Sequence, residues 1–208
     1  MRITYNIKLN EHITKYASKY FIVCLFFIIG IIIAVVSSNF IGQEIKADLI
    51  EYISSFINLL KTQDIDKQEL IKQILYNDFK PIFILWLLGA TIIGIPLILI
   101  YILLEGYNLA FTVSILGASL GISKSLLFTL IAIIPQYVII LPIIFYLAVN
   151  GMNFYSKIAK NNFDRKNLFY EFYVYTLRAV LLGIIMLGVV LFQVYIQPFL
   201  IKFLINFI

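Results

Sequence analysis

The chain has 208 residues, of which 62% are hydrophobic and only 13% charged, with a formal net charge of +5. Soluble domains contain roughly 45–50% apolar and about 25% charged residues. This composition therefore excludes a soluble enzyme, a disordered chain and a nucleic-acid-binding protein. The single cysteine, Cys24, excludes an internal disulfide, and with only one histidine, His12, a zinc site built on several such ligands is excluded as well. The composition predicts an integral membrane protein.

Five stretches approach the length of about 20 largely apolar residues that a helix needs to cross a bilayer. We predict spans over residues 20–38, 81–104, 107–122, 126–149 and 177–197. None of them carries a charge at mid-depth, and the third is short enough to be either a full crossing or a re-entrant segment. The first span is expected to be a retained anchor, because its exit lacks a small-x-small cleavage pattern. The prediction is an all-α integral membrane protein with five transmembrane helices in a single membrane domain, 1–208.

Basic residues concentrate on one side of these spans. The arm 1–19 and the loop 150–176 are rich in Lys and Arg, whereas the segment 39–80 and the tail 198–208 belong to a side where acids and bases balance. By the positive-inside rule the N-terminus is cytoplasmic and the C-terminus extracytoplasmic, in a multi-pass protein of the cell membrane. The arm should lie on the anionic inner leaflet, with His12 as a solvated interfacial residue. The aromatic residues of the loop indicate an interfacial belt and no nucleic acid partner.

The outer segment 39–80 has apolar residues at helical spacing opposite acidic ones. It predicts an outer hairpin of two amphipathic helices joined near residues 62–64. Since roughly 40 residues are too few for an independent domain, two interpretations stay open: the hairpin packs on its own membrane core, or it docks a partner. The candidate docking residues are Asp48, Glu51, Tyr76 and Phe79.

The predicted third span carries a stripe of small residues spaced by four, with a second small pair beside it. The stripe consists of Gly106, Ala110, Ser114 and Ala118, and the pair of Gly117 and Gly121. Small side chains let two helix backbones approach closely, so we expect helix packing within one chain or between copies, as in a homo-oligomer. Residues 117–121 also match the G-x-S-x-G pattern of serine hydrolases, but no base is near, and the match is interpreted as accidental.

Kinks and polar contacts are expected at a few positions inside the spans. The candidates are Gly94, Pro96, Pro135, Gln136 and Pro142. Proline frees a backbone carbonyl one turn back, so Gln136 is expected to make an interhelical hydrogen bond or to line a substrate path. Glu105 and Arg178 are both expected near the inner edge, where they either pair or each reach water.

The sequence contains no paired intramembrane carboxylates, no metal-ligand motif and no phosphate-binding loop. We therefore expect no catalytic residues, no cofactor and no metal, and hence no enzyme. A transporter is disfavoured because intramembrane ionisable residues, its usual mark, are missing from the predicted spans. A scaffold remains by elimination, with a transporter or permease-like subunit as the alternative.

Three runs of residues carry a family resemblance. Residues 88–96 (LGATIIGIP), then 105–107 (EGY) with 111–113 (FTV), and then 134–142 (IPQYVIILP) resemble the stage II sporulation protein M family in order and spacing. The resemblance covers essentially the whole chain. Some members of the wider family have His and Glu around the fourth-span proline, where this chain has Gln136 and Ile140.

The resemblance implies a role in endospore formation. It implies a place in the mother-cell membrane at the septum, and engagement of stage II sporulation proteins P and D. Those partners are peptidoglycan hydrolases that thin the septal wall and drive engulfment. This chain is then expected to be the membrane scaffold that positions them, with the lipid bilayer as its other partner.

Overall fold

A computed structural model describes residues 14–62, 67–91, 93–160 and 165–205. Within these ranges the chain forms helices and the short connections between them, without a β-strand. The helices are α2 (Ala17–Phe40), α3 (Gln43–Thr62), α4 (Lys67–Gly89), α5 (Gly94–Leu120), α6 (Ile122–Phe128), the π-helical segment η1 (Thr129–Ile133), α7 (Ile134–Lys160), α8 (Arg165–Tyr195) and α9 (Gln197–Ile205). The all-α prediction is confirmed for these residues.

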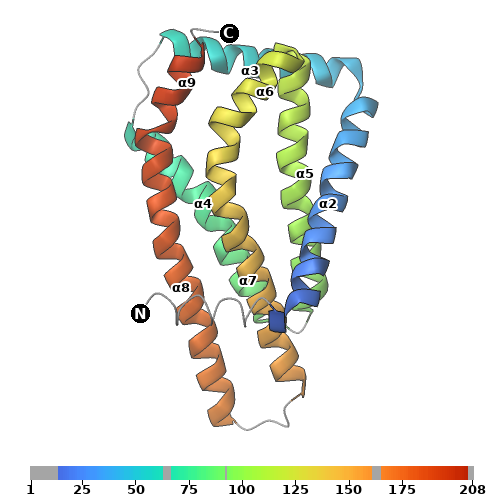
Figure 1. The fold of residues 1–208 in the computed structure, drawn as a ribbon, viewed down its shortest axis with the longest axis vertical. Helices are drawn as coiled ribbons and strands as arrows, with labels where there is room; N and C mark the ends of the chain where they lie inside the picture. The colour runs from blue at the N-terminus through green and yellow to red at the C-terminus, as the bar shows by residue number, and fades with distance from the viewer. Residues whose placement is uncertain (1–13, 63–66, 92, 161–164, 206–208) are drawn as a thin grey trace.

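Long helices α2, α4, α5, α7 and α8 run side by side as a bundle, while α3 lies across one end (Figure 1). Four helical stretches of the described residues are long and apolar enough to cross a membrane: 17–40, 94–120, 122–158 and 168–201. The helix α4 is not among them, because Lys72, Asp78 and Lys80 lie within it and leave too short an uncharged stretch. A membrane protein is therefore supported, but the count of five spans is not confirmed.

The predicted boundary between the second and third spans is wrong. The chain does not break at Glu105 and Gly106, which lie inside the continuous 27-residue α5. It turns instead after α4, where Thr91 N donates to the carbonyl of Leu88 at 3.1 Å and Gly94 N to that of Thr91 at 3.2 Å. The predicted third span is thus the second half of a helix that is long and apolar enough to cross a membrane.

The tightest helix packing joins α2 to α5. A Cβ atom added at Gly30 would meet the backbone of Leu103, and one added at Gly106 would meet the backbone of Phe27. Both positions therefore need glycine, because a side chain would push the two backbones apart. Around this contact a common core joins α2, α4, α5, α7 and α8, with its fully buried members including Val23, Leu85, Ile98, Ile102, Ile144, Leu147 and Met186.

The outer hairpin is only partly as predicted. The helix α3 exists and packs on its own bundle through Ile53, which contacts the cluster of Leu116, Phe128 and Ala132 from α5, α6 and η1. Residues 67–80, however, do not form a separate second helix. They are the first half of α4, which continues through Pro81 to Gly89 and runs back along the bundle (Figure 1).

The segment 150–176, predicted as a loop, is also mostly helical. The helix α7 continues to Lys160 and α8 begins at Arg165, so both project beyond the other helices at the end opposite to α3 (Figure 1). The two segments predicted on opposite sides of the membrane thus lie at opposite ends of the molecule. Which end is cytoplasmic stays a prediction.

Candidate functional site

A cavity of about 590 Å³ with many polar lining residues lies between α4, α5, α7 and α8. Its polar lining combines carboxylates, amides, phenols and one amine: Asn77, Asp78, Lys80, Tyr101, Glu105, Asn108, Gln136, Tyr137 and Gln193. Placing so many polar groups among apolar helices costs free energy in a membrane protein. Such groups commonly mark functional sites.

Helical spacing brings these groups together. On α5, Tyr101, Glu105 and Asn108 follow one another at four and three residues, so they share one face of the helix. The next residue after Glu105, Gly106, lies on the face that packs against α2. One helix therefore supplies both the close contact with α2 and one wall of the cavity.

The acidic side chains in the cavity are held by specific partners. Gln193 of α8, which is only 7% exposed, donates through Nε2 to Oδ2 of Asp78 at 2.6 Å. Glu105 accepts a hydrogen bond from the hydroxyl of Tyr101 and interacts electrostatically with Lys80. The hydrogen bond of Asp78 thus links α4 to α8, whereas Glu105 is hydrogen-bonded within α5 and interacts with α4 only electrostatically.

The expectation that Glu105 stands between two spans is wrong. Glu105 lies near the middle of α5 and lines the cavity rather than standing at the inner edge. It does not pair with Arg178, whose Nη1 donates instead to Oδ1 of Asn150 at 2.8 Å. The argument against a transporter, which relied on the absence of such residues, therefore loses its basis.

The predicted kink positions differ in outcome. Gly94 and Pro96 stand in the first turn of α5, directly after the turn from α4, so they begin a helix and do not kink a span. Pro135 is the second residue of α7, just after the π-helical segment η1, whose wider turn makes room for the proline ring. Gln136 beside it lines the cavity, as does Ile140. Pro142 is accommodated within the helix α7.

The residues of the small-residue stripe differ in burial. Gly106 and Ala110 are buried, and Gly106 lies against α2, whereas Ser114 is half-buried and Ala118 is exposed. A Cβ atom added at Gly117 would have Ser125 Oγ as its nearest neighbour, at 3.7 Å. Gly121 is a turn residue with φ 80° and no atom within 4 Å of an added Cβ, so it is not a packing residue. Self-association stays a prediction.

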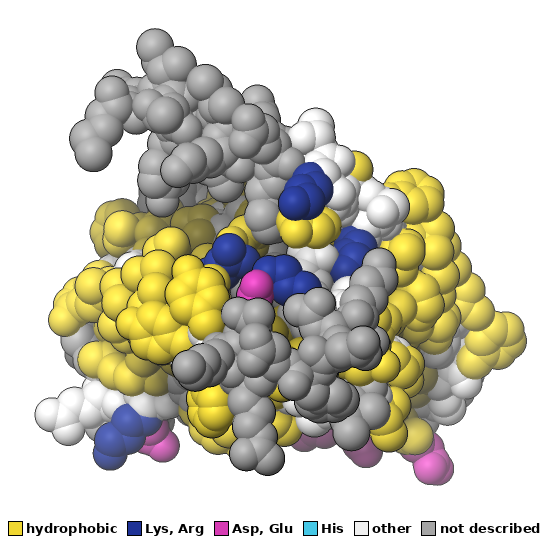
Figure 2. Space-filling model, turned by 90° about the horizontal axis from the view of Figure 1, so that it is seen from below, with side chains coloured by type: hydrophobic (Ala, Val, Ile, Leu, Met, Phe, Trp, Pro, Cys, Tyr) yellow, Lys and Arg dark blue, Asp and Glu magenta, His cyan; other side chains and the backbone are white. Residues whose placement is uncertain are grey.

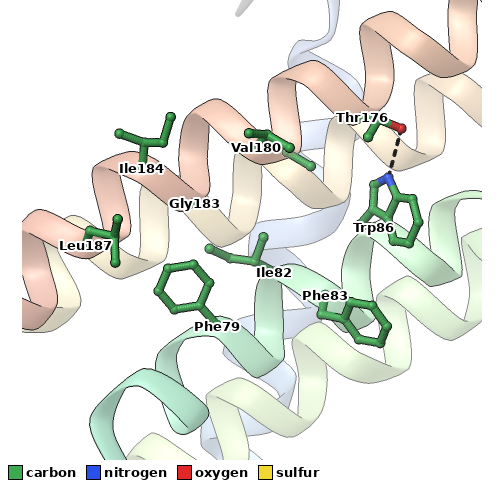
Figure 3. A pocket seen from close by; sticks show the side chains of 10 residues that line it. Phe79, Ile82, Phe83, Trp86, Thr176, Val180, Gly183, Ile184 and Leu187 are labelled. Atoms are coloured by element: carbon green, nitrogen blue, oxygen red, sulfur yellow. Dashed lines mark hydrogen bonds between the residues drawn. The ribbon is translucent and has the colours of Figure 1, made fainter. Parts of the chain in front are cut away.

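Three of the four candidate docking residues are exposed. Asp48 and Glu51 project from α3, and Tyr76 of α4 is 69% exposed. Phe79 instead lines an apolar groove of about 580 Å³ between α4 and α8 (Figure 3). At one end of this groove the indole nitrogen of Trp86 donates to Oγ1 of Thr176 at 3.1 Å.

The described residues show no arrangement for nucleophilic or metal chemistry. Ser119, the serine of the G-x-S-x-G match, has its hydroxyl buried without a hydrogen-bond partner, and His12 lies outside the described residues. No group of three or more potential metal ligands occurs in the part of the chain that the structure describes.

Comparison with known proteins agrees with the resemblance seen in the sequence. No curated protein and no solved structure matches the chain. The family model described as stage II sporulation protein M matches residues 23–196, which run from within α2 to the end of α8 and therefore include every group that lines the cavity. The chain therefore belongs to the stage II sporulation protein M family.

Proposed function

We propose that this protein is a membrane scaffold of endospore formation that recruits and positions peptidoglycan hydrolases, stage II sporulation proteins P and D, on the mother-cell side of the septum. Family membership supports the sporulation role. In this proposal the bundle anchors the assembly, and the hydrolases carry the chemistry that thins the wall during engulfment.

The observation that carries the proposal is the position of α3. This helix is fixed to the bundle on one side through Ile53 and leaves its acidic residues Glu44, Asp48 and Glu51 exposed on the other. Near the middle of α4, Tyr76 is exposed as well. Interfaces concentrate binding energy in a few aromatic anchors, while charges guide the approach of the partner. The helix α3 offers the charges, and α4 offers an aromatic side chain.

A pair of tyrosine variants tests the proposal. Tyr76→Ala should reduce the recovery of hydrolases with the tagged protein from sporulating cells, because it removes the exposed aromatic anchor of α4. Tyr173→Ala is the matched control, since Tyr173 is 63% exposed but belongs to the start of α8 at the opposite end. Recovery is measured by quantitative mass spectrometry, with membrane insertion checked by fractionation.

Equal recovery with both tyrosine variants would remove Tyr76 from the docking surface. Recovery of no wall hydrolase with the unaltered protein would contradict the scaffold function itself.

The polar cavity favours a second candidate function, a transporter or permease-like subunit. The partly buried Asp78 and Glu105 and the exposed Lys80 line it, and ionisable residues inside membrane proteins commonly mark ion or proton pathways. Proton uptake into proteoliposomes, driven by a potassium diffusion potential and read with a trapped pH-sensitive dye, tests this function. Uptake that Glu105→Gln abolishes would support it, whereas uptake equal to that of protein-free vesicles would exclude proton transport.

A further inference from the structure

A second, smaller cavity lies at the end opposite to α3. It has a volume of about 70 Å³ and is lined by Tyr16, Asn150, Asn153, Phe154, Lys157, Glu171, Val174, Tyr175 and Arg178. Viewed from this end, the molecule shows basic side chains gathered beside an acidic one and surrounded by hydrophobic side chains (Figure 2). The cavity is formed where α7 and α8 begin to project beyond the bundle.

A buried hydrogen-bond donor in this cavity has no acceptor. Asn150 is only 3% exposed, and its Oδ1 is occupied by the guanidinium of Arg178. That contact fixes the amide orientation and leaves Nδ2 of Asn150 buried without a hydrogen-bond partner. A buried amide donor left without an acceptor destabilises the folded state. The missing acceptor is therefore expected to come from a molecule that enters the cavity.

The charges around the cavity indicate an anion. Lys157 is neutralised by Glu171, the acidic residue of the lining, with Nζ 2.7 Å from each carboxylate oxygen. Arg178, in contrast, is held by the neutral oxygen of Asn150. The guanidinium thus retains its charge and further donors, and its planar fork suits phosphate oxygens.

The volume of the cavity and the residues around it limit which ligand it can bind. A volume of about 70 Å³ admits a phosphate-sized group but not a whole sugar or nucleotide. Phe169, Tyr170 and Tyr173 of α8 are all more than 60% exposed nearby, as expected for an aromatic belt at the level of the lipid headgroups. Basic pockets between helices at this level bind anionic headgroups. We propose that this cavity binds a phosphate group through Arg178 and Asn150 Nδ2, carried by an anionic phospholipid or free in solution.

Native mass spectrometry of the full chain tests the site. The detergent-purified protein is incubated with phosphatidylglycerol or with diacylglycerol of the same acyl chains, which lacks the phosphate. The unaltered protein should retain phosphatidylglycerol about tenfold better, because one charge-assisted hydrogen bond suffices for that ratio. Displacement of the lipid by millimolar inorganic phosphate would assign the site to free phosphate, and resistance to displacement would assign it to the phospholipid.

Two variants tie the binding to the cavity. Asn150→Asp keeps an acceptor for Arg178 and so preserves the helix contact, but it replaces the free donor with a negative charge. Arg178→Gln removes the cation. Each should lower phosphatidylglycerol retention about tenfold, whereas Lys72→Gln, an equal charge change at an exposed position of α4, should not. Equal retention of the two lipids, or unchanged retention in Asn150→Asp, would overturn the proposal. The cavity would then be expected to hold only water.

Discussion

The acidic side chains of two regions differ in what they contact. On α3, Asp48 and Glu51 are exposed. In the cavity, Asp78 accepts from Gln193, and Glu105 accepts from Tyr101 and interacts with Lys80. The exposed pair faces solvent, as the proposed docking surface requires, whereas the cavity pair is partly buried among the helices. The same residue type therefore points to two different functions, recruitment at the α3 end and transport through the cavity.

The largest effect on stability is expected from the cavity pair. Gln193→Leu should lower the free energy of unfolding by about 1–3 kcal/mol, because it leaves the Asp78 carboxylate inside the bundle without its donor. Gln43→Leu, the same change on an exposed position of α3, is the control and should change it by less than about 0.5 kcal/mol. Thermal unfolding in detergent measures both. Equal effects would mean that the two regions do not differ energetically.

A smaller effect is expected when only the charge of Glu105 is removed. Glu105→Gln keeps an oxygen that accepts from Tyr101, so the free energy of unfolding should change by less than about 1 kcal/mol. A larger loss in the same unfolding assay would show that the charge itself, together with Lys80, holds the helices together.

The smallest effect is expected on α3. Asp48→Asn and Glu51→Gln together should leave the free energy of unfolding unchanged within about 0.5 kcal/mol, because surface substitutions without intramolecular partners rarely exceed that value. A clear destabilisation in thermal unfolding would instead assign these carboxylates a structural role at the end of the bundle.

Long apolar runs were predictable and the break between helices was not. The predicted first and fifth spans, 20–38 and 177–197, largely coincide with α2 and α8, since uninterrupted apolar residues leave helix as the way to satisfy the backbone. The charged Glu105 and flexible Gly106 suggested a helix end, yet the turn falls after Gly89. There, an added Cβ would meet Gly151 of α7 and Tyr175 of α8, so the turn depends on tertiary contacts.

The cavity was not predicted either, because the expected helix break at residues 105 and 106 divided one of its walls. Tyr101, Glu105 and Asn108 form a polar stripe at helical spacing, a signal that becomes visible once α5 is a single helix. The hydrogen-bond partners of the polar side chains could not be predicted from the sequence. The bonds from Gln193 to Asp78 and from Arg178 to Asn150 depend on how separate helices are rotated toward one another, and spacing along one chain does not specify that rotation.

Recovery of hydrolases from sporulating cells, compared between the two acidic regions, tests the scaffold function most directly. Asp48→Lys with Glu51→Lys reverses the exposed charges, while Glu105→Gln neutralises a cavity charge; both proteins are tagged and quantified in the same membranes. The scaffold account predicts that the α3 variant loses about tenfold or more of the hydrolase and that the cavity variant recovers as much as the unaltered protein. Full recovery with the α3 variant and loss with the cavity variant would contradict it.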